Sequence, residues 1–198
     1  MKLKGIVLLL LLGTASVIAQ EEETLISSKI ESGGFGGPVL KIGSINGQTG
    51  ILVGGRGGWI INHTYIIGGG GYSLANDIKA RILGPNGERY LSFGYGGLEL
   101  EYISGSDRLI HYSVMALVGA GGLSWQDKNP NLHADLNSEN DTFFIFEPGV
   151  NVTMNVTSYF RISGGVSYRF ISGTQSSAAS NADLSGPTGV LTFHFGKF

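Results

Sequence analysis

Apolar and polar residues alternate along residues 159–170, YFRISGGVSYRF. Successive side chains of a β-strand point to opposite faces, so this segment presents one apolar face and one polar face. Residues 143–156 and 108–122 alternate in the same way. Such segments are longer than the roughly 5–6 residues of an ordinary strand in a soluble sheet. The pattern therefore predicts long β-strands.

Eight segments of this kind can be counted, and the connections between them alternate in length. The predicted strands are 34–45, 49–61, 64–75, 89–103, 108–122, 142–156, 158–171 and 187–198. The tight connections are 62–63, 104–107 and the region of Thr157, whereas the long polar ones are 76–88, 126–141 and 172–186. Only 46–48 departs from this alternation. A bulge is expected at Gly96-Gly97, where the alternation changes phase, and an unpaired backbone position is expected at Pro148.

The composition restricts where such strands can be placed. Charged residues make up 14% of the chain, against about 25% in a typical soluble domain. Glycine accounts for 33 of the 198 residues, and there is no cysteine. No apolar stretch after the first twenty residues reaches the about 20 residues that a membrane-spanning helix needs. We therefore predict an all-β fold, an eight-stranded antiparallel up-and-down transmembrane β-barrel.

The N-terminus has the features of an export signal. Two lysines, an apolar run and small residues before Ala19 form MKLKGIVLLLLLGTASVIAQ, which is the layout of a cleavable signal peptide. The expected organisation is a signal peptide at 1–19, a periplasmic segment at 20–33 and the barrel at 34–198. The chain carries no basic stretch, so no nucleic-acid partner is predicted.

An arginine stands among glycines in GGRGGW, residues 54–59. In a barrel of eight strands the interior is just wide enough to be filled by side chains, and glycines allow the wall to coil around a large one. Arg56 would point inward, where a buried charge needs a partner. We predict a lumenal network of charged residues from the polar strand faces, formed by Arg56, Glu99, Glu101, Glu147, Arg161 and Arg169, with Lys41 as a further candidate.

Large apolar side chains on the opposite strand faces would contact lipid. Trp59 is expected in an interfacial aromatic girdle. The predicted lipid-facing aromatic residues are Trp59, Phe144, Phe146, Phe160, Tyr168, Phe170, Phe193 and Phe195.

With its export signal, eight alternating strands, unequal connections and final LTFHFGKF, the chain resembles the small eight-stranded outer-membrane barrels of Gram-negative bacteria, such as outer-membrane proteins A, X and W. The resemblance covers the whole mature chain. It implies an outer-membrane location, contact with outer-membrane lipid, and a terminal aromatic residue, Phe198, read by the membrane-insertion machinery. One departure is that Gly196 and His194, rather than apolar residues, share the phase of Phe198, while Phe193 and Phe195 lie in the opposite phase.

The leading functional prediction is a non-enzymatic barrel with a lumen filled by side chains and polar extracellular loops, whose extracellular partner the sequence does not specify. No cofactor and no metal site are predicted. One alternative is a secreted soluble barrel that binds an apolar ligand, which would require the faces to be inverted. A second is a lipid-modifying hydrolase that uses His111 and Ser113, because the motif His-x-Ser places both side chains on one strand face.

Overall fold

The computed structural model describes residues 31–84, 87–127, 140–176 and 179–198. The predicted signal peptide at 1–19 and residues 20–30 of the predicted periplasmic segment lie outside the described residues. Strand structure begins at Ser32, two positions before the predicted start of the barrel.

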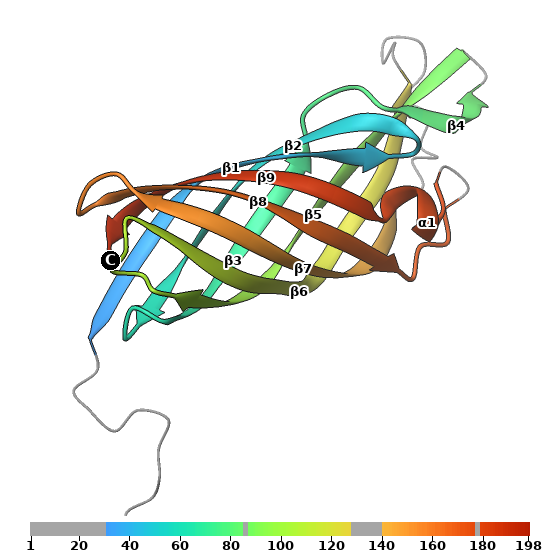
Figure 1. Ribbon diagram of the computed structural model, residues 1–198. Helices are drawn as coiled ribbons and strands as arrows, with labels where there is room; N and C mark the ends of the chain where they lie inside the picture. The colour runs from blue at the N-terminus through green and yellow to red at the C-terminus, as the bar shows by residue number, and fades with distance from the viewer. Residues whose placement is uncertain (1–30, 85–86, 128–139, 177–178) are drawn as a thin grey trace, which may run out of the picture.

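The described residues form nine strands and one short helix (Figure 1). The elements are β1 (Ser32–Ile45), β2 (Gln48–Ile61), β3 (Tyr65–Leu74), β4 (Lys79–Gly84), β5 (Gly87–Ser104), β6 (Ile110–Asp127), β7 (Asp141–Asn155), β8 (Phe160–Ser172), α1 (Asn181–Leu184) and β9 (Gly186–Lys197). No helix in these ranges is long and apolar enough to cross a membrane.

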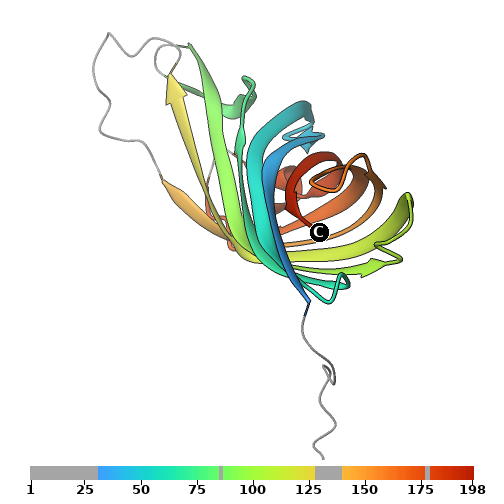
Figure 2. The ribbon, with the colours of Figure 1, turned by 90° about the vertical axis from the view of Figure 1, so that its left-hand side faces the viewer.

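All the strands except β4 form one closed antiparallel ring. The order of hydrogen-bonded neighbours is β3-β2-β1-β9-β8-β7-β6-β5, and a further pairing between β3 and β5 closes it. Figure 2 shows the ring obliquely from one end. The predicted eight-stranded antiparallel barrel is thus confirmed. We call the end that holds the start of β1, the end of β9 and the turns after β2, β5 and β7 the turn end, and the opposite end the loop end.

The strand β4 was not predicted, since 76–88 was expected to be a loop. It pairs only with the first residues of β5, with a shift in register between Lys79 and Leu83. Both β5 and β6 have 18 residues. Their ends and β4 project beyond the rim of the other strands at the loop end (Figures 1 and 2). We call this part, residues 79–84, 87–91 and 123–127, the hairpin extension.

The predicted bulge at Gly96-Gly97 is wrong. The pairing of β5 with β6 runs without a shift from Arg89 opposite Asp127 to Ser104 opposite Tyr112. The side chains that point inward change in character along β5, from apolar and aromatic near the loop end to acidic near the turn end. Because the inward face is apolar in one half of β5 and acidic in the other, the sequence wrongly indicates that the inward and outward faces exchange at Gly96-Gly97.

Prolines interrupt two ladders without shifting their register. The pairing of β7 with β8 omits Glu147 and Pro148 and resumes at Gly149. The pairing of β1 with β9 likewise omits Gly37 and Pro38. Proline has no N–H to donate to a ladder. The loss of pairing was expected at Pro148, and Pro38 interrupts its ladder for the same reason.

Close approach of neighbouring strands requires glycine in the wall. A Cβ built on Gly54 would collide with the backbone carbonyl of Gly71 on β3, and one built on Gly97 would collide with that of Val118 on β6. The many glycines of β2, β3, β5 and β6 therefore let a narrow barrel close.

The interior has an apolar cluster at each end. The larger cluster fills the loop end and includes Phe93, Phe143, Ile145 and Leu123, with Leu184 of α1. The smaller cluster lies at the turn end and consists of Phe35, Ile60, Ile66 and Ile103, with Phe198 packed against it. The buried side chains of Lys41, Arg56, Glu99, Glu101 and Glu147 lie between them.

Candidate functional site in the lumen and on the outer wall

Arg56 lies in the lumen between two glutamates of β5. Its Nε is 2.6 Å from Glu99 Oε2, and its Nη2 is 2.6 Å from Glu101 Oε2. The Nε–H is not aligned with Glu99 Oε2, so this contact is a charge contact, whereas Nη2 donates a hydrogen bond to Glu101. All three side chains are buried. Gly54 and Gly58, two residues before and after Arg56, share its inward face and place no side chain beside its guanidinium.

Lys41 and Glu147 form a second buried ion pair. Lys41 Nζ donates to both carboxylate oxygens of Glu147, at 2.8 and 3.0 Å. Glu147 also accepts from the Tyr95 hydroxyl at 2.7 Å and from the Ser167 hydroxyl at 2.6 Å. The side chains of Lys41 and Glu147 are 2% and 0% exposed. The carboxylate is thus satisfied by three donors, as a buried charge requires.

Tyr72 connects the two ion pairs. Its hydroxyl donates to Glu99 Oε1 at 2.5 Å, and Lys41 Nζ lies 3.6 Å from the centroid of its ring. The rings of Tyr72 and Tyr95 are 5.3 Å apart. Sequence analysis missed both tyrosines. Tyr95 and Glu99 lie four residues apart on β5 and so share a face, but the bulge expected at Gly96-Gly97 obscured this, and no inward positions were predicted for the segment that contains Tyr72.

Arg169 does not join the ion pairs. It is fully buried, and it donates to the backbone carbonyls of Leu184 and Ser44 and to the Thr188 hydroxyl, at 2.7, 2.9 and 3.2 Å. No carboxylate of the described residues forms a salt bridge with it. It lies near the loop end, where carbonyls at the ends of β1 and α1 are free to accept. Arg169 therefore ties α1 to the barrel.

Arg161 also lies apart from the carboxylates. It is half-buried near the turn end, with its guanidinium 4.1 Å from the centroid of the Phe198 ring. None of the salt bridges of the described part of the chain includes it. The predicted set of six thus divides into a connected group of Arg56, Glu99, Glu101 and Glu147 and two separate arginines, and Lys41 belongs with the connected group.

The His-x-Ser pair is in the lumen, away from lipid. His111 Nδ1 is 3.4 Å from the carbonyl of Arg108, and Ser113 Oγ has no hydrogen-bond partner among the described residues. A nucleophile and its base need to be within hydrogen-bond reach of each other. The only serine–histidine hydrogen bond in the described ranges joins Ser163 Oγ and His194 Nε2 at 2.8 Å, and both side chains are buried. No group of His, Asp and Glu in these ranges could hold a metal ion.

The outer wall, meaning the barrel face that points away from the lumen, is apolar. Trp59, Leu98, Tyr112 and Val166 are each half or more exposed on it. A soluble barrel has the opposite arrangement, so the outer wall argues against the alternative of a soluble carrier. Of the predicted lipid-facing aromatics, Trp59, Phe144, Phe146, Tyr168, Phe170 and Phe195 are exposed on this wall, and Phe160 and Phe193 are partly buried in a stack with Phe195.

These aromatics occupy two levels of the wall. Phe146, Tyr168 and Phe170 contact one another toward the loop end, with ring centroids 6.1 and 4.5 Å apart. Others lie near the turn end, where Tyr65 and Tyr102 have centroids 5.6 Å apart. Two such levels are the arrangement of interfacial aromatic girdles.

Phe198 does not share the wall of Phe195. Its ring stacks on Phe35 at 6.4 Å, inside the turn end of the barrel. Phe198 is out of phase with Phe193 and Phe195 in the sequence because its side chain points into the barrel.

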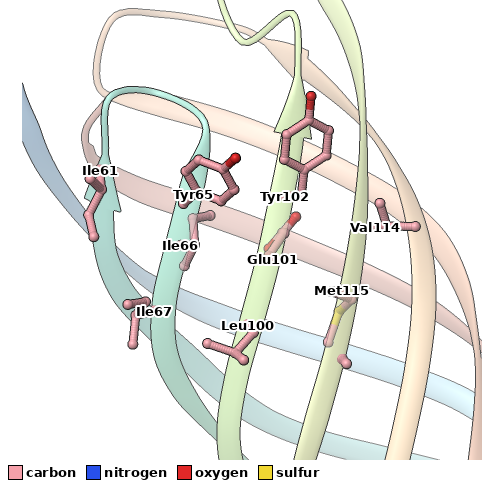
Figure 3. Close-up of a pocket in the computed structure, with 10 residues that line it drawn as sticks. Ile61, Tyr65, Ile66, Ile67, Leu100, Glu101, Tyr102, Val114 and Met115 are labelled. Carbon is pink, nitrogen blue, oxygen red and sulfur yellow. The ribbon is translucent and has the colours of Figure 1, made fainter. Parts of the chain in front are cut away.

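A groove of about 580 Å³ crosses the outer wall near the turn end (Figure 3). Its sides are formed by β3, β5 and β6, and the hydroxyl of Tyr102 points toward the turn end. The groove is lined by Ile61, Tyr65, Ile66, Ile67, Leu100, Glu101, Tyr102, Val114, Met115 and Ala116. A second groove of about 590 Å³ lies on the other side of Tyr102 and Val114, which are directly opposite each other on β5 and β6.

Known structures share this architecture at low sequence identity. Neisserial surface protein A superposes with a TM-score of 0.58 and 12% identity, over 86% of this chain and 100% of that one. The N-terminal β-barrel domain of Pseudomonas aeruginosa OprF superposes with a TM-score of 0.54 and 11% identity, over 83% of this chain and 96% of that domain. No protein-family model and no curated protein matches the sequence. Together with the apolar outer wall and the charged interior, these likenesses show that the chain has the fold of a small eight-stranded outer-membrane β-barrel.

Proposed function

We propose that this chain is a non-enzymatic, sealed barrel of the outer membrane that acts through the surface it displays at the loop end. The turn end then faces the periplasm, since short turns and both termini of such barrels lie there, and the loop end faces outward.

The observation that carries this proposal is the filled lumen. At the loop end the rings of Phe93 and Phe143 stack at 5.2 Å, and Phe93 is 1% exposed. Below them the linked ion pairs of Arg56 and Lys41 occupy the middle of the barrel. A lumen filled in this way by side chains leaves no path for a solute, as is usual for eight strands.

The hairpin extension supplies the displayed surface. A strand of 18 residues at about 3.4 Å per residue, tilted by roughly 40°, rises about 45 Å, whereas the apolar band of such barrels is about 25 Å tall. Arg89 packs over the Trp125 ring, 3.6 Å from its centroid, and thereby joins β5 to β6 above the band. A projection of this kind suits contact with molecules outside the cell. The buried state of His111 and Ser113 supports the absence of hydrolase activity.

Two measurements test the proposal. Purified protein in planar phospholipid bilayers should give no stepwise ion conductance, and discrete steps by the wild-type chain would contradict a sealed lumen. An epitope inserted between residues 85 and 86 should bind antibody on intact cells. The same epitope at Asn62-His63 should bind only after the outer membrane is permeabilised. The reverse result would invert the proposed orientation.

We also infer that the outer-membrane insertion machinery recognises Phe198. The terminal aromatic residue of the resembling barrels supports this inference, while the inward ring of Phe198 in the folded barrel requires that recognition precede closure. Deletion of Phe198 should reduce the fraction of protein that migrates as a heat-modifiable band. An equal yield of folded protein would contradict recognition of Phe198.

A further inference from the structure

We propose that a polar pocket at the loop end of the barrel wall binds a primary ammonium group, with Asp77 as its counterion. The pocket has a volume of about 220 Å³ and lies where the chain passes from β3 to β4, beside β5. Only the placement of this ligand outside the cell rests on the proposed function. The pocket is lined by Leu74, Ala75, Asn76, Asp77, Tyr90, Leu91 and Ser92.

The pocket exists because the chain leaves β5 at the end of β3 and then returns to it. The ladder between β3 and β5 ends at Ser73. The N–H of Ala75 donates to a carbonyl of β2 at 2.8 Å, so the chain follows β2 instead. It meets β5 again at Ile78, whose carbonyl accepts from the N–H of Leu91 at 2.8 Å. Residues 74–77 therefore bow away from β5 and enclose the pocket.

Side-chain hydrogen bonds hold this bow in place. Asn76 Oδ1 accepts from the N–H of Ile51 at 2.7 Å, and Asn76 Nδ2 donates to the carbonyl of Thr49 at 2.9 Å. Just after the bow, the N–H of Lys79 donates to Gln48 Oε1 at 3.2 Å, and its carbonyl accepts from Gln48 Nε2 at 3.1 Å. The pocket is thus preformed, which lowers the ordering cost of binding.

Asp77 gives the pocket its charge. It is exposed, and its carboxylate takes part in none of the hydrogen bonds and ion pairs of the described residues. It is also the only charged residue among the described residues that line the pocket. A carboxylate only accepts hydrogen bonds, whereas an ammonium group only donates them, through three N–H groups. Ser92 and Tyr90 line the same pocket, and a hydroxyl oxygen and an aromatic ring both attract a cation.

The level of the pocket makes it accessible to a charged ligand. Tyr102 lies with the aromatic residues near the turn end, and Ser92 lies farther along β5 toward the loop end. At about 3.4 Å per residue and a tilt of roughly 40°, the strand rises about 26 Å between them, whereas the apolar band is about 25 Å tall. The pocket therefore lies at the outer edge of the band, where a cation need not enter hydrocarbon.

An ammonium group on a short alkyl stem suits the pocket better than an uncharged sugar. Leu74 is half-buried and Ala75 is exposed, so both offer apolar contact to a stem. A sugar also requires donors for its hydroxyl oxygens, and the amide of Asn76 already donates to β2. Two sources carry a primary ammonium group, a free amine in the medium and the ethanolamine headgroup of a lipid beside the barrel.

Nuclear magnetic resonance of the nitrogen-15-labelled full chain, in micelles of a non-ionic polyoxyethylene detergent, tests the site. Titration with n-butylammonium chloride at constant ionic strength should shift the amide resonances of Asp77, Tyr90 and Ser92 to saturation. Asp77→Asn should bind at least fivefold more weakly than wild type. The control Asp107→Asn removes the same charge at the turn end and should bind as wild type does. Ala75→Trp fills the pocket with the carboxylate intact and should also bind at least fivefold more weakly.

Heat-shifted migration in SDS gels shows whether each variant is folded. Equal binding by wild type and Asp77→Asn, or shifts that grow without saturation, would overturn the proposal. A response of the same resonances to methyl glucoside, with none to n-butylammonium, would overturn it as well.

Nanodiscs distinguish the two sources of the ammonium group. Weaker binding of n-butylammonium when phosphatidylethanolamine replaces phosphatidylcholine would identify the lipid headgroup as the natural occupant, and equal binding would identify a free amine. None of these measurements depends on which end of the barrel faces outward or on whether the lumen conducts.

Discussion

The ion pair of Lys41 and Glu147 gives the sharpest test of the lumen. In Glu147→Gln the side chain keeps its shape and loses its charge, so Lys41 remains buried at 1% exposure without a counterion. At 2.8 Å and an effective dielectric constant of about 20, the attraction between two unit charges is about 6 kcal/mol, and the cost of removing both ions from water offsets much of it. When one partner is removed, the desolvation of the remaining buried charge is no longer compensated and destabilises the barrel.

We therefore expect Glu147→Gln to lower the free energy of unfolding by about 3–5 kcal/mol. The measurement is urea unfolding of the barrel in phospholipid vesicles, followed by the fluorescence of Trp59 and Trp125. With a urea dependence of about 2 kcal/mol per molar, the midpoint should fall by roughly 2 M. The exposed turn residue Asp107 provides a control, because Asp107→Asn should change stability by less than about 0.5 kcal/mol.

A double-mutant cycle separates the pair from its surroundings. Lys41→Met leaves Glu147 buried and should also destabilise the barrel. The double variant should cost less than the sum of the two single variants, with a coupling energy of about 2–3 kcal/mol. If Glu147→Gln stays within about 0.5 kcal/mol of wild type, or if the two changes are additive, then water reaches the pair and the reasoning is wrong.

Three further predictions concern the wall and the interior. Arg56→Met leaves two buried glutamates without a cation, and the same urea assay should show a loss of about 3–5 kcal/mol. Gly97→Ala places a methyl group against the Val118 carbonyl and should reduce the yield of heat-modifiable barrel, whereas Gly71→Ala meets open space and should refold as wild type does. Phe93→Ala removes a ring from the stacked cluster at the loop end and should cost about 3–5 kcal/mol in the urea assay; a loss below about 1 kcal/mol would mean that the cluster is loosely packed.

The strands of the ring were predictable because alternation records which face of a strand is polar. In β8 the outward Val166 and Phe170 alternate with the inward Ser167 and Arg169, so the sequence separates the two faces. At the start of β7 this signal disappears. Phe143 is buried in the lumen while Phe144 is exposed on the outer wall, so both faces are apolar and the buried cluster at the loop end could not be distinguished from the lipid-facing wall.

The partners of charged residues were predictable only where the partner was a side chain of opposite charge. Arg56 was paired with acidic residues because carboxylates stood on polar strand faces. Arg169 instead bonds backbone carbonyls of Ser44 and Leu184. Every residue carries a carbonyl, so the sequence holds no sign of which carbonyl will be free at a strand end.

The two facing glycine runs of β2 and β3 have a consequence for how the barrel closes. Gly55, Gly57 and Gly58 lie opposite Gly71, Gly69 and Gly68, so sliding one strand along the other displaces almost no side-chain packing in this stretch. Strands of this kind specify their register weakly. Arg56 is the one side chain in the run 54–58. A slip of one residue would turn it toward lipid, at a cost of about 2–4 kcal/mol near the midplane. Arg56 contacts Glu99 and Glu101 of β5, which lies on the far side of β3. These contacts thus fix the register of β2 against β3, which the glycines alone leave undetermined.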